Sequence, residues 1–224
     1  RSGAIVIEVI EGSLDSVELT TTEDSSTRLN QRYVRDRLNV STGEPLNVAN
    51  LQESLQLLQL NPLIGSVRAE LNAGPTPVSS LLTVAYEEAP TFDTVINLNN
   101  GRSPSVGSFQ RQVSLSEANL FGFGDRINLT YANSEGSNSV SAGYTIPLNS
   151  ADGTLDFSYS TAWNDVIEEP FNDVDNDGSG PDIESTSSTY ELTYRQPVSR
   201  SIKQRTFQEF AVGLTTSFRD SQSF

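Results

Sequence analysis

The sequence contains no cysteine, no histidine and no methionine. Without histidine, the chain lacks the commonest general base and the commonest transition-metal ligand. Without cysteine it forms no disulfide, although an extracytoplasmic protein of this size can manage without one. No run of about 18 apolar residues occurs, which excludes a membrane-spanning α-helix but leaves the alternating strands of a β-barrel open. Because the chain starts at Arg1, with neither methionine nor a signal peptide, we expect it to be part of a longer polypeptide.

Positive charge is also scarce. The 224 residues include 14 Lys and Arg against 29 Asp and Glu, a formal net charge of −15. Such a chain repels phosphates, which argues against a nucleic-acid partner. No glycine-rich loop followed by Lys-Ser or Lys-Thr occurs, so no nucleotide is expected. The carboxylates have no histidine or nucleophile beside them, and the sequence therefore predicts a non-enzyme that needs no catalytic cofactor.

The first part of the chain, up to about residue 90, mixes helical and strand periodicities. The segments expected to form strand, helix, helix, strand and strand are 14–19, 28–40, 48–60, 66–71 and 81–87. Asn47 is a good N-cap for the second helix, and Asn61-Pro62 ends it because the residue before proline resists the α region. This order predicts a small α+β domain.

After Pro90 the helical period disappears and seven stretches alternate. They are 92–98, 109–115, 127–131, 140–148, 155–163, 191–195 and 210–218. One face of each carries large apolar residues and the other mostly Ser, Thr, Gly, Ala and Asn. A soluble sandwich would turn its apolar face inward, and a membrane barrel would turn it toward lipid. Small polar residues favour the barrel, because large charges would crowd a narrow lumen.

The connections between these stretches give a second indication. If the α+β part lies in the periplasm, the longest connection, 164–187, falls on the outer side, where barrels carry their long loops. The segments 117–125 and 197–205 would then be periplasmic turns, although both are somewhat long for that place. The loop pattern therefore supports the barrel modestly.

Six short motifs carry a resemblance to a known family. They occupy 9–12, 43–47, 55–64, 67–74, 119–125 and 143–148. In order and spacing they resemble the last POTRA (polypeptide-transport-associated) domain and the first barrel hairpins of two-partner secretion transporters, the haemolysin/haemagglutinin secretion-activation family. The resemblance spans nearly the whole chain.

The resemblance implies a fold class and a location. An α+β POTRA domain of β-α-α-β-β order would precede antiparallel strands of a transmembrane β-barrel, about seven of about sixteen. Residues 1–11 would end a preceding POTRA domain, 12–90 would form a POTRA domain, and 91–224 would be the N-terminal part of the barrel. The barrel would lie in the bacterial outer membrane and the POTRA domain in the periplasm.

The resemblance also implies a function. The POTRA domain would capture the N-terminal secretion domain of an unfolded exoprotein, an adhesin or cytolysin, and the barrel would conduct it outward among outer-membrane lipids. An outer-membrane protein insertion factor of the same superfamily is the alternative, and a soluble β-sandwich adhesin is a second one.

An extended polypeptide can be captured by pairing with an exposed sheet edge. The candidate edge is 66–71, where Ser66, Arg68 and Glu70 alternate out of the expected core. The neighbouring Leu51, Leu55 and Leu58 are expected to be core residues.

Arginines supply two further candidates. Arg28, Arg32 and Arg35 are spaced i, i+4, i+7 and would form a basic stripe. It could attract acidic substrate segments or lipid headgroups, or it could be an ordinary solvated helix face. In the barrel half, Arg111 shares the parity of the apolar residues and is expected at a membrane boundary, whereas Arg195 shares the polar face and is expected in the lumen.

A calcium-loop pattern occurs in the longest connection. Asp173, Asp175, Asp177 and Glu184 match positions 1, 3, 5 and 12 of the D-x-D-x-D-G-x5-E loop. Carboxylate oxygens suit a hard cation, but no helices flank the segment and Pro181 stiffens position 9. Calcium in an outer loop is therefore an open prediction, beside the ordinary alternative of an acidic surface loop.

Overall fold

The computed structural model of the chain describes residues 11–21, 27–38, 45–173, 178, 181, 183–203 and 206–223. Within it the chain divides into two compact units. The first comprises residues 1–89 with 201–208, and the second comprises 90–200 with 209–224. Residues 1–10, most of the segment expected to end a preceding POTRA domain, lie outside the described residues.

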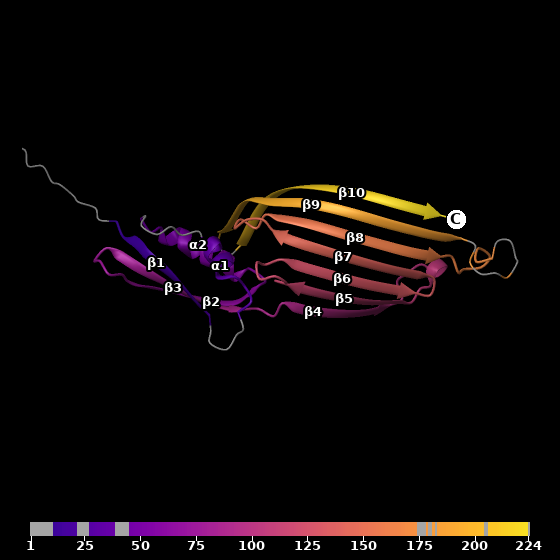
Figure 1. The fold of residues 1–224 in the computed structure, drawn as a ribbon, viewed down its shortest axis with the longest axis horizontal. Coiled ribbons are helices and arrows are strands. Elements are labelled where there is room, and N and C mark those ends of the chain that lie inside the picture. The colour runs from indigo at the N-terminus through magenta and orange to yellow at the C-terminus, as the bar shows by residue number, and fades with distance from the viewer. Residues whose placement is uncertain are drawn as a thin grey trace, which may run out of the picture. The chain divides into compact units, whose positions relative to one another are not determined.

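The first unit contains a three-stranded sheet and two helices (Figure 1). Its elements are β1 (Ser13–Thr21), α1 (Gln31–Leu38), α2 (Val48–Gln59), β2 (Ile64–Ala73) and β3 (Ser79–Glu88). β3 lies in the middle, parallel to β1 and antiparallel to β2. The order of elements is the one predicted from periodicity.

Local signals explain the second helix and the core of this unit. The Asn47 side chain accepts a hydrogen bond from the Asn50 N–H at 3.1 Å and caps α2. α2 ends just before Pro62, as expected. On β3 every second side chain is buried against the helices, namely Leu82, Val84 and Tyr86. The other buried apolar residues of the unit include Leu14, Val34, Leu38, Leu51 and Leu58.

The first helix starts later than predicted. Arg28 and Leu29 precede it, and their N–H groups donate to the Glu88 carboxylate at 3.2 Å and 2.8 Å. The Asn30 Oδ1 accepts from the Arg32 N–H at 2.9 Å, in the manner of a cap. The helix therefore begins at Gln31, and the predicted helical stripe of three arginines is wrong at Arg28.

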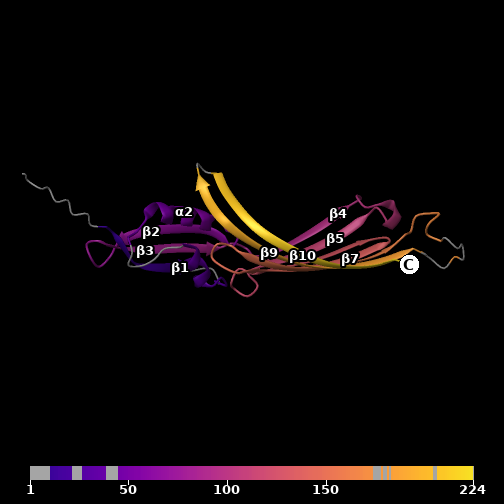
Figure 2. The same ribbon diagram turned by 90° about the horizontal axis from the view of Figure 1, so that it is seen from above.

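The second unit is a seven-stranded antiparallel sheet in which neighbours in sequence are neighbours in space (Figure 1). Its strands are β4 (Phe92–Asn99), β5 (Gln110–Ala118), β6 (Arg126–Ser134), β7 (Ser137–Pro147), β8 (Thr154–Asp165), β9 (Glu184–Lys203) and β10 (Thr206–Ser223). A 3-10 turn, η1 (Pro104–Val106), lies between β4 and β5. The sheet is curved rather than flat (Figure 2). All seven predicted strands are present.

The pairing register separates an apolar face from a polar one. Leu115, Leu129, Ala142 and Tyr159 lie opposite one another in a row across β5 to β8. The adjacent row consists of Ser114, Thr130, Ser141 and Ser160. Since side chains alternate along a strand, the first row belongs to the apolar face and the second to the polar face.

Two connections differ from the prediction. Within the segment expected to be a turn, 197–205, the described residues 197–203 are strand, since β9 continues to Lys203 and β10 begins at Thr206. Pro197 has no N–H to donate, yet it does not interrupt β9. The β8–β9 pairing ends where Arg195 lies opposite Thr154, so no β8 residue requires a hydrogen bond from Pro197. The longest connection spans 166–183, slightly shorter than expected.

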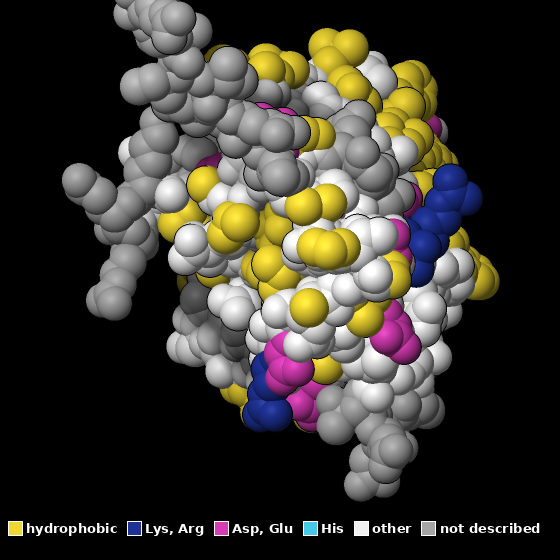
Figure 3. Space-filling model, turned by 90° about the vertical axis from the view of Figure 1, so that its left-hand side faces the viewer, with side chains coloured by type: hydrophobic (Ala, Val, Ile, Leu, Met, Phe, Trp, Pro, Cys, Tyr) yellow, Lys and Arg dark blue, Asp and Glu magenta, His cyan; other side chains and the backbone are white. Residues whose placement is uncertain are grey.

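Figure 3 shows the face of the molecule that forms the left-hand side of Figure 1. Hydrophobic side chains (yellow) gather toward the upper right of this view, and the few basic side chains (dark blue) lie beside acidic ones. No helix in the described ranges combines the length and apolarity required to cross a membrane.

Candidate binding surfaces

The first surface is the edge strand β2. Its one neighbour in the three-stranded sheet, as far as the chain is described, is β3. Ser66, Arg68 and Glu70 are exposed and lie opposite Glu87, Ala85 and Thr83 of β3. Because Val67 lies opposite the buried Tyr86, these three side chains occupy the face of the sheet away from the core. The strand thus combines a main-chain edge with exposed polar side chains.

The arginine candidates are not brought together as one stripe. Arg32 and Arg35 are exposed on α1, whereas Arg28 precedes the helix. The Arg32 Nε lies 3.6 Å from the Asp36 carboxylate. Arg37, which sequence reasoning missed, places its guanidinium 3.5 Å from the centre of the Tyr33 ring. Charge on this helix is therefore partly neutralised.

A buried tyrosine, Tyr86, lies on β3 next to β2 and close to the segment that precedes α1. Tyr86 is 1% exposed, and its hydroxyl finds no hydrogen-bond partner within the described part of the chain. Burial, and next the nearby Glu88 carboxylate, raise the pKa of Tyr86 above its ordinary value of 10.0. Glu88 itself holds the segment before α1. The end of β3 therefore contributes Tyr86 to the core and Glu88 to the hydrogen bonds that hold the segment before α1.

The second surface is the polar face of the seven-stranded sheet. Hydroxyl groups bridge neighbouring strands, with Ser114 and Thr130 at 3.0 Å and Thr193 and Thr215 at 2.9 Å. Arg195 lies on the same face as Thr193, two residues along β9, and its guanidinium contacts Glu209. The face thus carries mostly small polar side chains, together with the charged residues Arg126, Asp156 and Glu191 and the ion-paired Arg195.

A chain of ion pairs extends from Arg195 at one end of the sheet. Glu209 also contacts the Arg200 Nε at 3.1 Å, and Arg200 in turn contacts Asp152 in the turn between β7 and β8. Sequence reasoning missed Arg200 and Glu209, because their pairing depends on how three strands align. The chain of ion pairs ties this end of the sheet together.

The apolar face carries a polar cluster at its other end. The Arg111 guanidinium donates to Asn133 Oδ1 at 3.2 Å and lies 5.4 Å from the centre of the Phe109 ring. Asn138 Oδ1 accepts from the Tyr131 hydroxyl and from the Asn133 amide, both at 2.9 Å. Arg111 thus lies on the predicted face, among polar groups at the ends of β5, β6 and β7.

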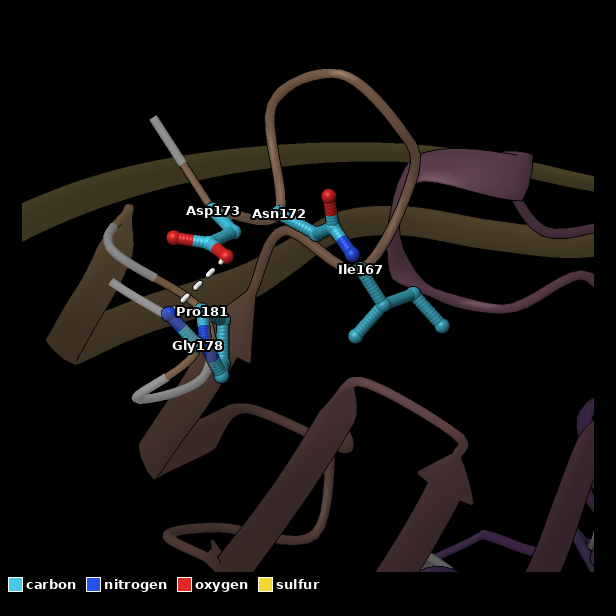
Figure 4. Close-up of a pocket in the computed structure, with 5 residues that line it drawn as sticks. All are labelled: Ile167, Asn172, Asp173, Gly178 and Pro181. Atoms are coloured by element: carbon cyan, nitrogen blue, oxygen red, sulfur yellow. Dashed lines mark hydrogen bonds between the residues drawn. The ribbon is translucent and has the colours of Figure 1, made fainter. Parts of the chain in front are cut away.

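The 166–183 loop holds a cavity of about 250 Å³ lined by Ile167, Asn172, Asp173, Gly178 and Pro181 (Figure 4). Asp173 Oδ2 accepts a hydrogen bond from the Gly178 N–H at 3.1 Å. Asp175 and Asp177 lie outside the described residues, and Glu184 begins β9. No group of three candidate metal ligands occurs among the described residues. Calcium binding stays a prediction.

The arrangement of the second unit defines its class. A curved antiparallel sheet with sequential strands, one apolar face and one face rich in hydroxyl groups has the features of a transmembrane β-barrel wall. Its two longest connections, 100–109 and 166–183, lie at the same end of the strands, as the long loops of outer-membrane barrels do, and the tight 135–136 turn lies at that end too.

Comparison with known families agrees. The model of the family "Haemolysin secretion/activation protein ShlB/FhaC/HecB" matches residues 79–222. The chain therefore belongs to this family of outer-membrane protein transporters of two-partner secretion, which excludes the soluble sandwich. No curated protein sequence matches it.

Solved structures show the same fold. CdiB from Escherichia coli has a TM-score of 0.64 at 20% identity, over 95% of this chain and 38% of that one. CdiB from Acinetobacter baumannii has a TM-score of 0.63 at 17% identity, over 96% and 38%. BamA from Haemophilus ducreyi lacking POTRA domains 1-3 has a TM-score of 0.64 at 13% identity, over 93% and 36%. The chain thus spans little more than a third of the length of these structures.

Proposed function

We propose that the chain contributes the docking domain and the first strands of a two-partner secretion pore of about sixteen strands. Residues 12–90 act as a POTRA domain in the periplasm, and residues 91–224 form the first part of the barrel. The substrate is the N-terminal secretion domain of an unfolded exoprotein, an adhesin or cytolysin. The observation that carries the proposal is an exposed edge strand, β2, in the same chain as a barrel wall.

Capture uses the backbone of β2. An extended polypeptide pairs with the strand's free edge, while Ser66, Arg68 and Glu70 contact its side chains. Because this face carries one cation, Arg68, and one anion, Glu70, it suits a substrate segment that has both basic and acidic residues. Arg28, Arg32 and Arg35 add weak attraction for acidic segments.

Conduction uses the polar face of the sheet. Hydroxyl-bearing side chains offer replaceable hydrogen bonds to a passing backbone without holding any one residue type. Conduction needs no catalytic step on this proposal, because the substrate's own folding outside supplies the driving force. Export by the purified transporter in vesicles without nucleotide supports this point, and a strict nucleotide requirement contradicts it.

The capture step is tested by cross-linking in cells that express the full transporter and its exoprotein. A photoreactive amino acid replaces Arg68 on β2, and the control replaces Thr83 on the same face of the central strand β3. We expect a cross-link to the exoprotein at Arg68 and a much weaker one at Thr83. Equal yields at both positions, or none at either, would contradict edge pairing.

The structural likeness to BamA keeps a second function open, namely insertion of outer-membrane proteins. The same cross-linking experiment separates the two. Under this alternative, Arg68 cross-links to newly made barrel proteins in cells that lack the exoprotein.

A further inference from the structure

The turn between β5 and β6, residues 119–125, exposes three large apolar side chains. Leu120, Phe121 and Phe123 are 38%, 70% and 40% exposed, although Asn119 and Asp125 at the two ends of the turn are almost fully buried. The turn therefore places its polar side chains inside and its apolar side chains outside. Exposing such a cluster to water is unfavourable, so its surroundings require an explanation.

The inverted arrangement is built into the turn. Asp125 Oδ1 accepts from the Phe121 N–H at 2.9 Å, and Asn119 Oδ1 accepts from the Gly124 N–H at 3.0 Å. Asn119, Gly122 and Gly124 have φ of 76°, 90° and 83°, in the left-handed region that glycine and asparagine tolerate. The exposed aromatic rings are thus held in place and do not result from a loose loop.

The turn folds over the apolar face of the sheet. The Tyr144 hydroxyl donates to Asp125 Oδ2 at 2.8 Å, and the Phe121 ring meets the Tyr144 ring edge-on with centres 6.4 Å apart. Tyr144 lies opposite Ile127 and Phe157, in a row of the apolar face. The cluster is therefore continuous with the surface that faces lipid, and it lies away from the polar lumen.

The depth of the turn also fits lipid. The nine residues of β5 span about 30 Å, and at a barrel tilt of about 40° they rise about 23 Å. The apolar band of such barrels is about 25 Å tall. The turn that follows β5 therefore lies at the edge of this band, at the level where aromatic belts occur.

We propose that Leu120, Phe121 and Phe123 form a membrane anchor in the headgroup region of the periplasmic leaflet. The three side chains contact lipid through apolar surface and carry no charge. The buried Asn119 and Asp125 keep the turn rigid. The anchor sets the depth at which the β5–β6 hairpin sits. It depends on the membrane location of the chain and not on which polypeptide is exported.

The test measures lipid contact at single positions of the full-length transporter in phosphatidylcholine vesicles. This chain has no cysteine, so an F121C variant, in a transporter freed of any cysteine elsewhere, takes one environment-sensitive fluorophore. The control is A151C in the β7–β8 turn, an exposed position next to Asn149 and Asp152. We expect lipids brominated near the headgroup to quench the label at 121 at least about twofold more than the label at 151.

Two outcomes overturn the proposal. One is equal quenching of both labels by brominated lipid. The other is protection of the label at 121 from aqueous iodide without quenching by brominated lipid, because then a polypeptide covers the turn. A label introduced as F123C repeats the measurement, so poor assembly of one variant does not leave the result undecided.

Discussion

The strands of both units alternate apolar and polar residues, but the apolar side chains are buried in the first unit and exposed in the second. In the first unit Leu82, Val84 and Tyr86 of β3 are buried against helices. In the second unit Leu129 and Tyr131 of β6 are 43% and 48% exposed, with the same spacing. Of the thirteen buried apolar residues in the described ranges, twelve belong to the first unit. The comparison teaches that alternation identifies a face, whereas the solvent around the protein decides whether that face is inside.

The largest effect is expected in the core of the first unit. Leu82→Ala removes a side chain that is 1% exposed on the central strand and leaves a cavity, so we expect a loss of about 2–5 kcal/mol in the free energy of unfolding. Urea unfolding of the detergent-solubilised protein, followed by its helical circular dichroism, measures this. The half-exposed neighbour is the control, and Thr83→Ala should cost less than about 1 kcal/mol. Similar losses for both would mean that β3 is not packed on one face.

The next effect tests which solvent surrounds the second unit. Leu129→Arg places a charge in the middle of the apolar face, and in lipid this costs about 2–4 kcal/mol. The matched change on the polar face, Thr130→Arg, should cost much less. The folded fraction in vesicles across a urea series, read from heat-modifiable electrophoretic mobility, compares the two. An unchanged folded fraction for the Leu129→Arg variant would mean that this face is in contact with water.

A smaller effect is expected where the second unit does bury polar groups. Asp125→Ala removes the acceptor for the Phe121 N–H and the Tyr144 hydroxyl, and we expect a loss of about 1–3 kcal/mol in the same assay. The control Asp93→Ala changes an exposed carboxylate on β4 and should be nearly neutral. An equally neutral Asp125→Ala would show that the turn does not depend on its buried carboxylate.

The smallest effect concerns pH. Burial raises the pKa of Tyr86, so its neutral form is favoured in the folded state. Its contribution to stability is complete below pH about 10 and falls as the pH rises from there through the folded pKa. Tyr86→Phe should remove this part of the alkaline loss and change stability at pH 7 by less than about 1 kcal/mol, since the hydroxyl has no partner in the described ranges. Urea unfolding at pH 7 and at about pH 11 checks both points. An unchanged alkaline loss would assign the titration to another group.

Alternation predicted the seven strands and their faces because a period of two is a local property that each strand repeats. Strand ends were less predictable. β9 passes through Pro197 because no β8 residue pairs with it there, and pairing partners are not visible in one segment. The placement of Ser66, Arg68 and Glu70 away from the core followed from the same alternation.

Features that depend on contacts between distant residues could not be predicted from the sequence. The start of α1 is set by Glu88, about sixty residues further along, which binds the N–H groups of Arg28 and Leu29. The turn at 119–125 was visible as a motif, but its buried Asp125 depends on Tyr144 from another hairpin. The combination of asparagine, two glycines and aspartate around phenylalanines was the available signal, and it indicated a turn without its orientation.

The sequential strand order of the second unit has a consequence for how the protein assembles. Each strand from β4 to β10 pairs with its neighbour in the chain, so hairpins close small loops, as where Ser134 meets Ser137. In the first unit β1 must instead find β3 across a long stretch, joining Val17 to Leu82. Loop-closure entropy and contact order therefore make the barrel strands the faster to pair locally, one hairpin templating the next. The first unit, although smaller, cannot complete its sheet until its last and central strand, β3, is available.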